Sequence, residues 1–271
     1  GRCPLNTQGC PFLTPGPIGD DSPLRILSPE VVDPIRKLRH FVVDSERSAG
    51  RLLARILAPE ALRETVFHVL NEHTDPKTVA GLLEPALLGK DLGILSEAGC
   101  PCVADPGADL VSEAHRREIR VVPLPGPSSI LLALMASGLS GQIFEFLGYL
   151  PVKSEERRAA LKRLEQEAFR DGSTKIFIEA PYRNSVLLSD ALAVLEAETR
   201  LCVAVSLGGA SERILSLDIR GWRSAELTLG REPAVFLLAR KADPGALTGR
   251  PSEGRRRPGR TENRTDRKSV V

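Results

Sequence analysis

Several features that mark particular classes of protein are missing from this sequence. Aromatic residues make up only 4% of its 271 residues, so it shows no platform of stacking side chains for nucleic acid. It has no apolar run of roughly 18 residues, and its N-terminus shows no basic segment followed by an apolar one. The five cysteines are odd in number and scattered, which is typical of a reducing compartment. We therefore expect a cytoplasmic protein without a membrane span or signal peptide.

Common chemical motifs are also missing. The sequence contains neither Gly-x-Gly-x-x-Gly nor a P-loop, so a nucleotide-phosphate cradle has no support. No Ser/His/Asp set or metal cluster can be assembled from residue spacing. Cys100 and Cys102 are too close for a zinc ribbon or a thioredoxin motif, and no second cysteine pair follows. We interpret them as small packing residues and expect no metal.

The charge is unevenly distributed. The net charge is +2, but residues after Ala242 contribute eight basic and four acidic side chains, which leaves a slightly acidic body. Residues 1–242 therefore lack the excess of basic charge that is typical of a strong non-specific nucleic-acid binder. The tail is rich in Gly, Pro and Arg, so we expect residues 243–271 to be disordered. Its last six residues match the translation of a common sequencing adaptor, and we exclude it from fold reasoning.

The order of apolar patterns predicts an α/β fold. Short strand-like runs alternate with helical patterns from Leu13 onward, which favours a parallel sheet with helices on both faces. After Gln142 the strands follow one another more often, which favours a mixed sheet. We therefore expect two α/β domains, residues 13–127 and 128–242, after an irregular start over residues 1–12.

Three helices illustrate what the patterns predict. Ser45 is placed to cap a helix that runs to about Leu57. Ser128 to Ser137 is almost entirely apolar, which predicts a buried helix. The basic residues on the helix from Ser154 to Phe169 alternate with acids, which predicts a solvated face with i,i+4 ion pairs; these residues are Arg157, Arg158, Lys162 and Arg163.

Two loops mark the predicted ligand site. The apolar run from Leu92 ends in the loop Ser96-Glu97-Ala98-Gly99-Cys100-Pro101, and a helix follows Gly107. The stretch Val121 to Leu124 ends in the second loop, Pro125-Gly126-Pro127-Ser128-Ser129. A buried parallel strand that ends in a Gly/Pro loop and leads into a helix is where open α/β sheets place ligands. We favour ligand contact over a plain tight turn, and we expect the two loops to form one wall of a ligand cleft.

For two further loops, the sequence allows both a functional and a purely structural role. Asn71-Glu72-His73 follows a predicted strand, and His73 is either a proton-transfer or substrate-binding residue or an ordinary solvated histidine. Glu179-Ala180-Pro181-Tyr182-Arg183-Asn184 also follows a strand. There Tyr182 and Arg183 either clamp a ligand or simply belong to a helix start that Asn184 caps.

Six motifs follow one another along the chain: Thr14-Pro15-Gly16-Pro17-Ile18-Gly19-Asp20, Asn71-Glu72-His73, Ser96 to Pro101 with Asp105-Pro106-Gly107, Pro123 to Ser129, Phe146-Leu147-Gly148-Tyr149-Leu150-Pro151, and Glu179 to Arg183. Together they resemble the tetrapyrrole (corrin/porphyrin) methylase superfamily over about Leu13 to Lys241. Within that superfamily they look most like the branch of the ribosomal RNA small subunit methyltransferase I proteins.

The resemblance implies a homodimer of subunits with two α/β domains and a ligand cleft between them. The cleft would bind S-adenosyl-L-methionine, the methyl donor. It implies donor contacts at Pro15, Gly99, Cys100, Pro101, Val103, Ser128, Ser129, Glu179, Ala180, Pro233 and Ala234. Asn71, Tyr182 and Arg183 would face the methyl acceptor. Glu97 and His73 are the candidates to take the acceptor's proton.

The acceptor implied by this branch is ribosomal RNA, methylated on a ribose 2'-oxygen. The first strand is shorter than the family's, and Glu97 and Cys100 stand where the RNA branch usually has Asp and Thr. The segment Ser206 to Glu212 also lacks that branch's usual basic residue. Two alternatives therefore stay open: a methylase of a small tetrapyrrole-like acceptor, and a catalytically silent donor-binding or regulatory module.

Overall fold

The first sheet is built from the short apolar strands of the N-terminal half. In the computed structural model, which describes residues 8–19, 22–71, 73–225 and 228–240, this sheet has five strands. They are β1 (Pro11–Thr14), β2 (His40–Val43), β3 (Val66–Val69), β4 (Leu92–Leu95) and β5 (Val122–Pro123). Their order is β3-β2-β4-β1-β5, and neighbouring strands run parallel. The predicted parallel sheet is confirmed.

Helices cover both faces of this sheet. They are α1 (Pro23–Ile26), α2 (Pro29–Lys37), α3 (Glu46–Leu53), α4 (Pro59–Arg63), α5 (Pro76–Val79), η1 (Ala80–Leu83), α6 (Glu84–Leu87) and α7 (Ala108–Arg116). Successive residues of β2 point to opposite faces, as expected of a strand. Phe41 packs with Ile35 and Leu53 of α2 and α3, whereas Val42 joins the cluster of Leu83 and Leu110 from η1 and α7.

The second sheet is mixed, as predicted. Its strands are β6 (Phe144–Tyr149), β7 (Thr174–Ile178), β8 (Thr199–Val205), β9 (Arg213–Asp218) and β10 (Ala234–Arg240). Their order is β6-β7-β10-β8-β9. β6 and β7 pair in parallel, and β10 pairs antiparallel with both β7 and β8, as β9 does with β8.

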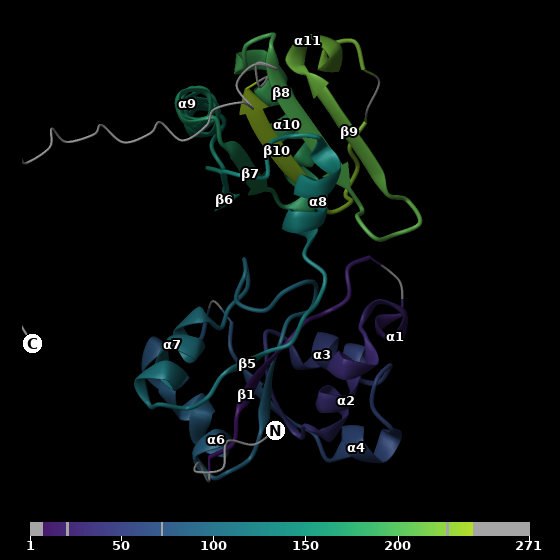
Figure 1. Ribbon diagram of the computed structural model, residues 1–271, viewed down its shortest axis with the longest axis vertical. Coiled ribbons are helices and arrows are strands. Elements are labelled where there is room, and N and C mark those ends of the chain that lie inside the picture. The colour runs from purple at the N-terminus through teal and green to yellow at the C-terminus, as the bar shows by residue number, and fades with distance from the viewer. Residues whose placement is uncertain (1–7, 20–21, 72, 226–227, 241–271) are drawn as a thin grey trace, which may run out of the picture. The chain divides into compact units, whose positions relative to one another are not determined.

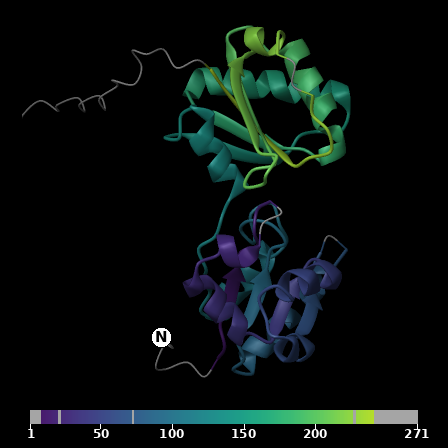
Figure 2. The same cartoon turned by 90° about the vertical axis from the view of Figure 1, so that its right-hand side faces the viewer.

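Helices also lie on both sides of the second sheet (Figures 1 and 2). They are α8 (Ser129–Ser137), α9 (Ser154–Asp171), η2 (Pro181–Arg183), α10 (Asn184–Val194) and α11 (Ile219–Trp222). One face packs Ile176 and Leu237 against Leu134 of α8. The opposite face packs Phe177 and Phe236 against helices α9 and α10, with the two rings stacked at 5.8 Å between centroids.

Two helix predictions need correction. The apolar helix α8 is only half-buried: Ala133 and Leu134 are covered, but Leu131 is 49% and Met135 78% exposed. Arg157 was expected on a solvated face of α9 but is buried, with its guanidinium paired with Asp190 of α10. The i,i+4 pattern did apply to Arg163, which pairs with Glu167 at 3.6 Å.

The remaining sequence predictions about the ends and boundaries stay predictions. The tail over residues 243–271 and the first seven residues lie outside the described residues. The predicted boundary between residues 127 and 128 falls just before α8. No helix in the described part of the chain is long and apolar enough to cross a membrane.

Candidate functional site

A cavity of about 410 Å³ lies where loops from both halves of the chain meet. Its volume is within the range of small-molecule sites, roughly 300–1,000 Å³. The loops after β1 and β4, the start of α8 and the ends of β7, β8 and β10 all contribute to it. Eight residues expected to contact the donor line it: Gly99, Cys100, Val103, Ser128, Ser129, Glu179, Pro233 and Ala234.

The other expected donor contacts, Pro15, Pro101 and Ala180, are not among the residues that line the cavity. Pro15 is buried against Gly126, where an added Cβ would come within 2.2 Å of the Pro15 side chain. Pro101 is also buried. The backbone N–H of Ala180 donates to the Glu179 carboxylate at 2.7 Å. These residues shape the loops that line the cavity.

The loop after β4 is fixed by backbone contacts to its neighbours. Gly16 and Gly99 form an antiparallel bridge, which joins the loops after β1 and β4. The Cys100 thiol donates to the carbonyl oxygen of Pro127 at 3.4 Å, which joins the loop after β4 to the second Gly/Pro loop. Gly99 has φ +78°, a left-handed conformation that favours glycine. Cys100, Cys102 and Cys202 are free thiols.

Asp105 belongs to a motif quoted from the sequence, but it was not among the predicted site residues. It lines the main cavity and also a second cavity of about 80 Å³, which it shares with Asp44 and Glu97. Burial raises the pKa of Asp105, a hydrogen bond with Ser96 offsets part of the rise, and the carboxylate of Asp44 adds to it. Asp105 is half-buried, and a partly desolvated carboxyl group with a raised pKa beside a cavity is typical of a functional residue.

The remaining predicted residues lie outside the main cavity's lining. Glu97 is exposed and lines only the smaller cavity. His73 is exposed, and its backbone N–H donates to the Asn71 side chain at 3.0 Å, which orders the loop after β3. Tyr182 is 65% exposed, with the Arg183 guanidinium 5.4 Å from its ring centre. Arg183 itself is held by Glu179.

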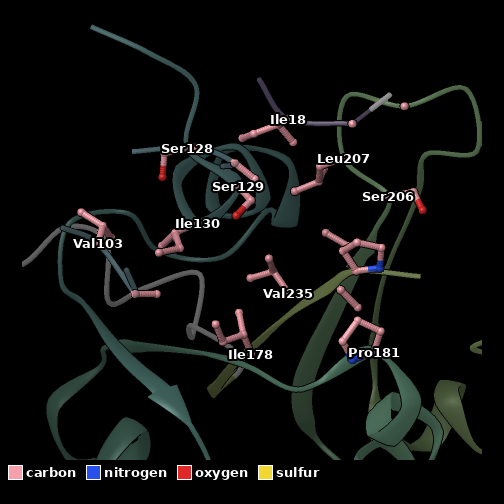
Figure 3. A pocket seen from close by; sticks show the side chains of 18 of the residues that line it. Ile18, Val103, Ser128, Ser129, Ile130, Ile178, Pro181, Ser206, Leu207 and Val235 are labelled. Carbon is pink, nitrogen blue, oxygen red and sulfur yellow. The ribbon is translucent and has the colours of Figure 1, made fainter. Parts of the chain in front are cut away.

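The cavity also has an apolar wall that the motifs did not reveal. Ile178, Val235 and Ala204 occupy paired positions on β7, β10 and β8, and all three line the cavity (Figure 3). Ile130 and Leu207 add to this surface. In the sequence these residues look like ordinary core positions, because only the strand register shows that they share one row. Among the described residues, no group of three or more His, Cys, Asp or Glu side chains could hold a metal ion.

Solved structures define the class of fold. The chain is similar to the methyltransferase CobJ, with a TM-score of 0.58 and 18% identity over 86% of this chain and 95% of that one. It is also similar to cobalt precorrin-4 methyltransferase, a cobalamin biosynthetic enzyme, with a TM-score of 0.52 and 12% identity over 88% and 98% of the two chains. The two-sheet architecture is therefore that of these α/β methyltransferases.

Sequence comparisons identify the family. The family model of the tetrapyrrole (corrin/porphyrin) methylases matches residues 26–220. The ribosomal RNA small subunit methyltransferase I of Vibrio cholerae is 31% identical over 208 residues, 77% of this chain and 68% of the relative. That of Pseudomonas aeruginosa is 31% identical over 236 residues, 86% and 79% of the two chains. The chain belongs to the tetrapyrrole methylases and is an S-adenosylmethionine-dependent methyltransferase.

Proposed function

We propose that this protein transfers a methyl group from S-adenosylmethionine to a ribose 2'-oxygen of small-subunit ribosomal RNA. The observation that carries this proposal is its similarity to the ribosomal RNA small subunit methyltransferase I proteins. It extends over 68% and 79% of the length of two of them. We further propose that it acts in the cytoplasm as a homodimer, as the family resemblance implies.

The cavity has properties that suit the donor. It offers an apolar wall for a flat ring and serine hydroxyl groups for polar contacts. We propose that Gly99, Ser128 and Ser129 hold one side of the molecule. Glu179, Pro233 and Ala234 would hold the other. When bound, S-adenosylmethionine supplies a methyl group on a positively charged sulfur, which makes that methyl group electrophilic.

The chain's own contribution is to align the acceptor and remove its proton. Positioning of two reactants can supply a large part of a rate enhancement. Glu97 and His73 remain our proposals for the proton acceptor. Asp105 joins them because it lies on both cavities and its pKa is raised, which brings it nearer to that of an effective general base.

A two-part experiment tests this function. Calorimetry first measures binding of S-adenosylmethionine. Donor labelled on its methyl group is then incubated with small ribosomal subunits, with extracted RNA and with a tetrapyrrole. We expect label in RNA only. Label in the tetrapyrrole would establish the small-molecule alternative, and binding without transfer to either would establish the silent module.

A further inference from the structure

A groove of about 440 Å³ lies among α2, α3 and α4, which stand together beside the first sheet (Figure 1). It is lined by Arg36, Arg39 and Arg55 and otherwise only by Ala, Ile and Leu residues between positions 54 and 61. None of these residues lines the cavity at the candidate donor site. We call this surface the arginine groove, and it is separate from the site already described.

The positive charge of the arginine groove is not neutralised within it. Its lining, all in the described part of the chain, contains no acidic residue. Arg36 pairs with Asp33 at 3.4 Å and Arg39 pairs with Glu64 at 3.3 Å, and both acids lie outside the lining. The side chains of these acids are 59% and 70% exposed, so such pairs are weak. The groove is therefore a local concentration of positive charge on a slightly acidic body.

Backbone carbonyl groups hold two of the three guanidinium groups in place. The Nε atom of Arg36 donates to the carbonyl oxygen of Ile56 at 3.3 Å. The Nη1 atom of Arg39 donates to the carbonyl oxygens of Arg36 and Leu38 at 2.9 and 2.8 Å. A carbonyl oxygen is uncharged, so these bonds orient the side chains without cancelling their charge. Arg55 is exposed, and its side chain has no hydrogen bond or ion pair among the described residues.

These features suit the phosphate groups of a nucleic-acid backbone. A guanidinium group presents a planar fork of N–H donors that matches two phosphate oxygens. The lining that the structure describes has no aromatic side chain on which a base could stack, so the backbone is the part of an RNA that it fits. Contacts of this kind position an RNA without reading its sequence.

The arginine groove lies at the opposite end of the first sheet from the donor cavity. Arg39 directly precedes β2, whereas the cavity loops follow the carboxyl ends of β1 and β4. β2 runs parallel to β4, with His40 opposite Leu92. At about 3.3 Å per residue, the four residues of β2 separate the two ends by roughly 13 Å. An RNA in the groove is therefore held at nucleotides other than the one that is methylated.

We propose that the arginine groove binds backbone phosphates of the RNA substrate outside the methylation site, through Arg36, Arg39 and Arg55. This assignment rests on the proposed function, because it takes small-subunit ribosomal RNA as the ligand. The groove contributes affinity for the RNA and has no contact with the methyl donor or the reacting atoms.

The salt dependence of RNA binding tests this assignment. Fluorescence anisotropy measures the Kd of labelled small-subunit ribosomal RNA over a series of KCl concentrations. Each phosphate contact contributes roughly 0.7–0.9 to the slope of log Kd against log salt concentration. Arg55→Gln removes one contact without breaking a side-chain hydrogen bond or ion pair among the described residues. We expect its slope to be lower by roughly 0.7–0.9 and its affinity at low salt to fall by about threefold to tenfold. Adding Arg36→Gln should about double the change in slope.

Arg170→Gln is the matched control. Arg170 is exposed in the last turn of α9, lies outside the groove lining and has no side-chain partner among the described residues. Its removal takes away the same charge and should leave the slope as in the wild type. Thermal unfolding and calorimetry with S-adenosylhomocysteine check that each variant is folded, and all should bind this compound as the wild type does.

Three results would overturn the assignment, and each has a separate meaning. Equal slopes in the wild type, Arg55→Gln and Arg170→Gln, with methyl transfer to RNA by the wild type, would overturn it and leave the proposed function intact. Absence of methyl transfer to RNA by the wild type would overturn both. Calorimetry with inorganic phosphate separates RNA from a free anion. Phosphate binding with a Kd below about 1 mM that Arg55→Gln abolishes would assign the groove to a small anionic ligand instead.

Discussion

Gly16 and Gly99 exchange two backbone hydrogen bonds, with N–O distances of 2.9 and 3.2 Å. Gly16 lies just after β1 and Gly99 after β4, two adjacent parallel strands. This contact holds the loop after β4, which lines the cavity, at the carboxyl end of the sheet. A Cβ on Gly16 would lie 2.4 Å from the backbone oxygen of Ser96, so no side chain fits there without moving the loop.

We therefore predict that Gly16→Ala weakens both the fold and the donor site. Its melting temperature should fall, and its affinity for S-adenosylhomocysteine should drop by about tenfold or more. Gly50→Ala is the control, because Gly50 lies inside α3 with open space around it. That change should raise stability by about 0.5–1 kcal/mol and leave binding unchanged. Similar behaviour of the two variants would contradict this role for Gly16.

A second prediction concerns the ion pair between α9 and α10. Arg157 donates to Asp190 at 2.8 Å through Nε, and its Nη1 donates to the Val152 carbonyl oxygen at 2.6 Å, which anchors the chain after β6. Arg157→Met should cost about 3–5 kcal/mol of unfolding free energy, because removing one partner leaves a buried charge poorly compensated. Arg158 also pairs with Asp190 but is half-exposed, so Arg158→Met should cost about 1 kcal/mol or less. Denaturant titration measures the unfolding free energy of both variants. Equal losses in Arg157→Met and Arg158→Met would contradict the prediction that burial makes the Arg157 pair the more stabilising one.

The third prediction is a pH dependence at Asp105. Burial raises its pKa above the ordinary 3.8. The pKa of Asp105 is therefore higher in the folded protein than in the unfolded chain. The folded protein is most favoured while the carboxyl is protonated, and it loses free energy of unfolding as pH rises from about 3.8 through the folded-state pKa. Asp105→Asn should therefore match the wild type in unfolding free energy at low pH and become increasingly more stable than it as pH rises through this interval. A difference that does not change with pH would contradict this prediction.

The same substitution tests catalysis. If Asp105 takes the acceptor's proton, Asp105→Asn should lower methyl transfer by about a hundredfold or more with little change in affinity for S-adenosylhomocysteine. Asp109→Asn, on α7 and exposed, provides the comparison. Unchanged transfer in Asp105→Asn would leave Glu97 and His73 as the candidates.

A fourth prediction concerns the apolar row. Ala204 is 1% exposed and lines the cavity, so Ala204→Leu should fill the space above the row and reduce affinity for S-adenosylhomocysteine by about tenfold or more. Ala239, also buried in the second sheet, lies outside the lining. Both substitutions to Leu should destabilise by about 1–3 kcal/mol through overpacking. Calorimetry should show that only Ala204→Leu loses affinity, and loss in both would argue against a specific role for the row.

Residues of the candidate site could be predicted from the sequence where the site is shaped by the local backbone of a loop. Gly99, Ser128 and Ser129 stand out because Gly/Pro loops after apolar strands leave a clear local pattern. Arg157 does not, since its partner Asp190 lies on another helix and the pattern of charges on α9 alone indicates a solvated face. The row of Ile178, Val235 and Ala204 escaped detection for a similar reason. Strand register joins residues that are far apart in the chain, and aliphatic side chains at strand ends resemble ordinary core.

Nucleoside analysis of ribosomal RNA tests the central claim most directly. Small-subunit RNA is purified from an Escherichia coli strain that lacks its own ribosomal RNA small subunit methyltransferase I, with and without expression of this chain. Mass spectrometry then compares the nucleosides of the two samples. We predict a 2'-O-methylated nucleoside that is present only when the chain is expressed. Identical nucleosides in both samples, with the protein folded and able to bind S-adenosylmethionine, would contradict the proposed function.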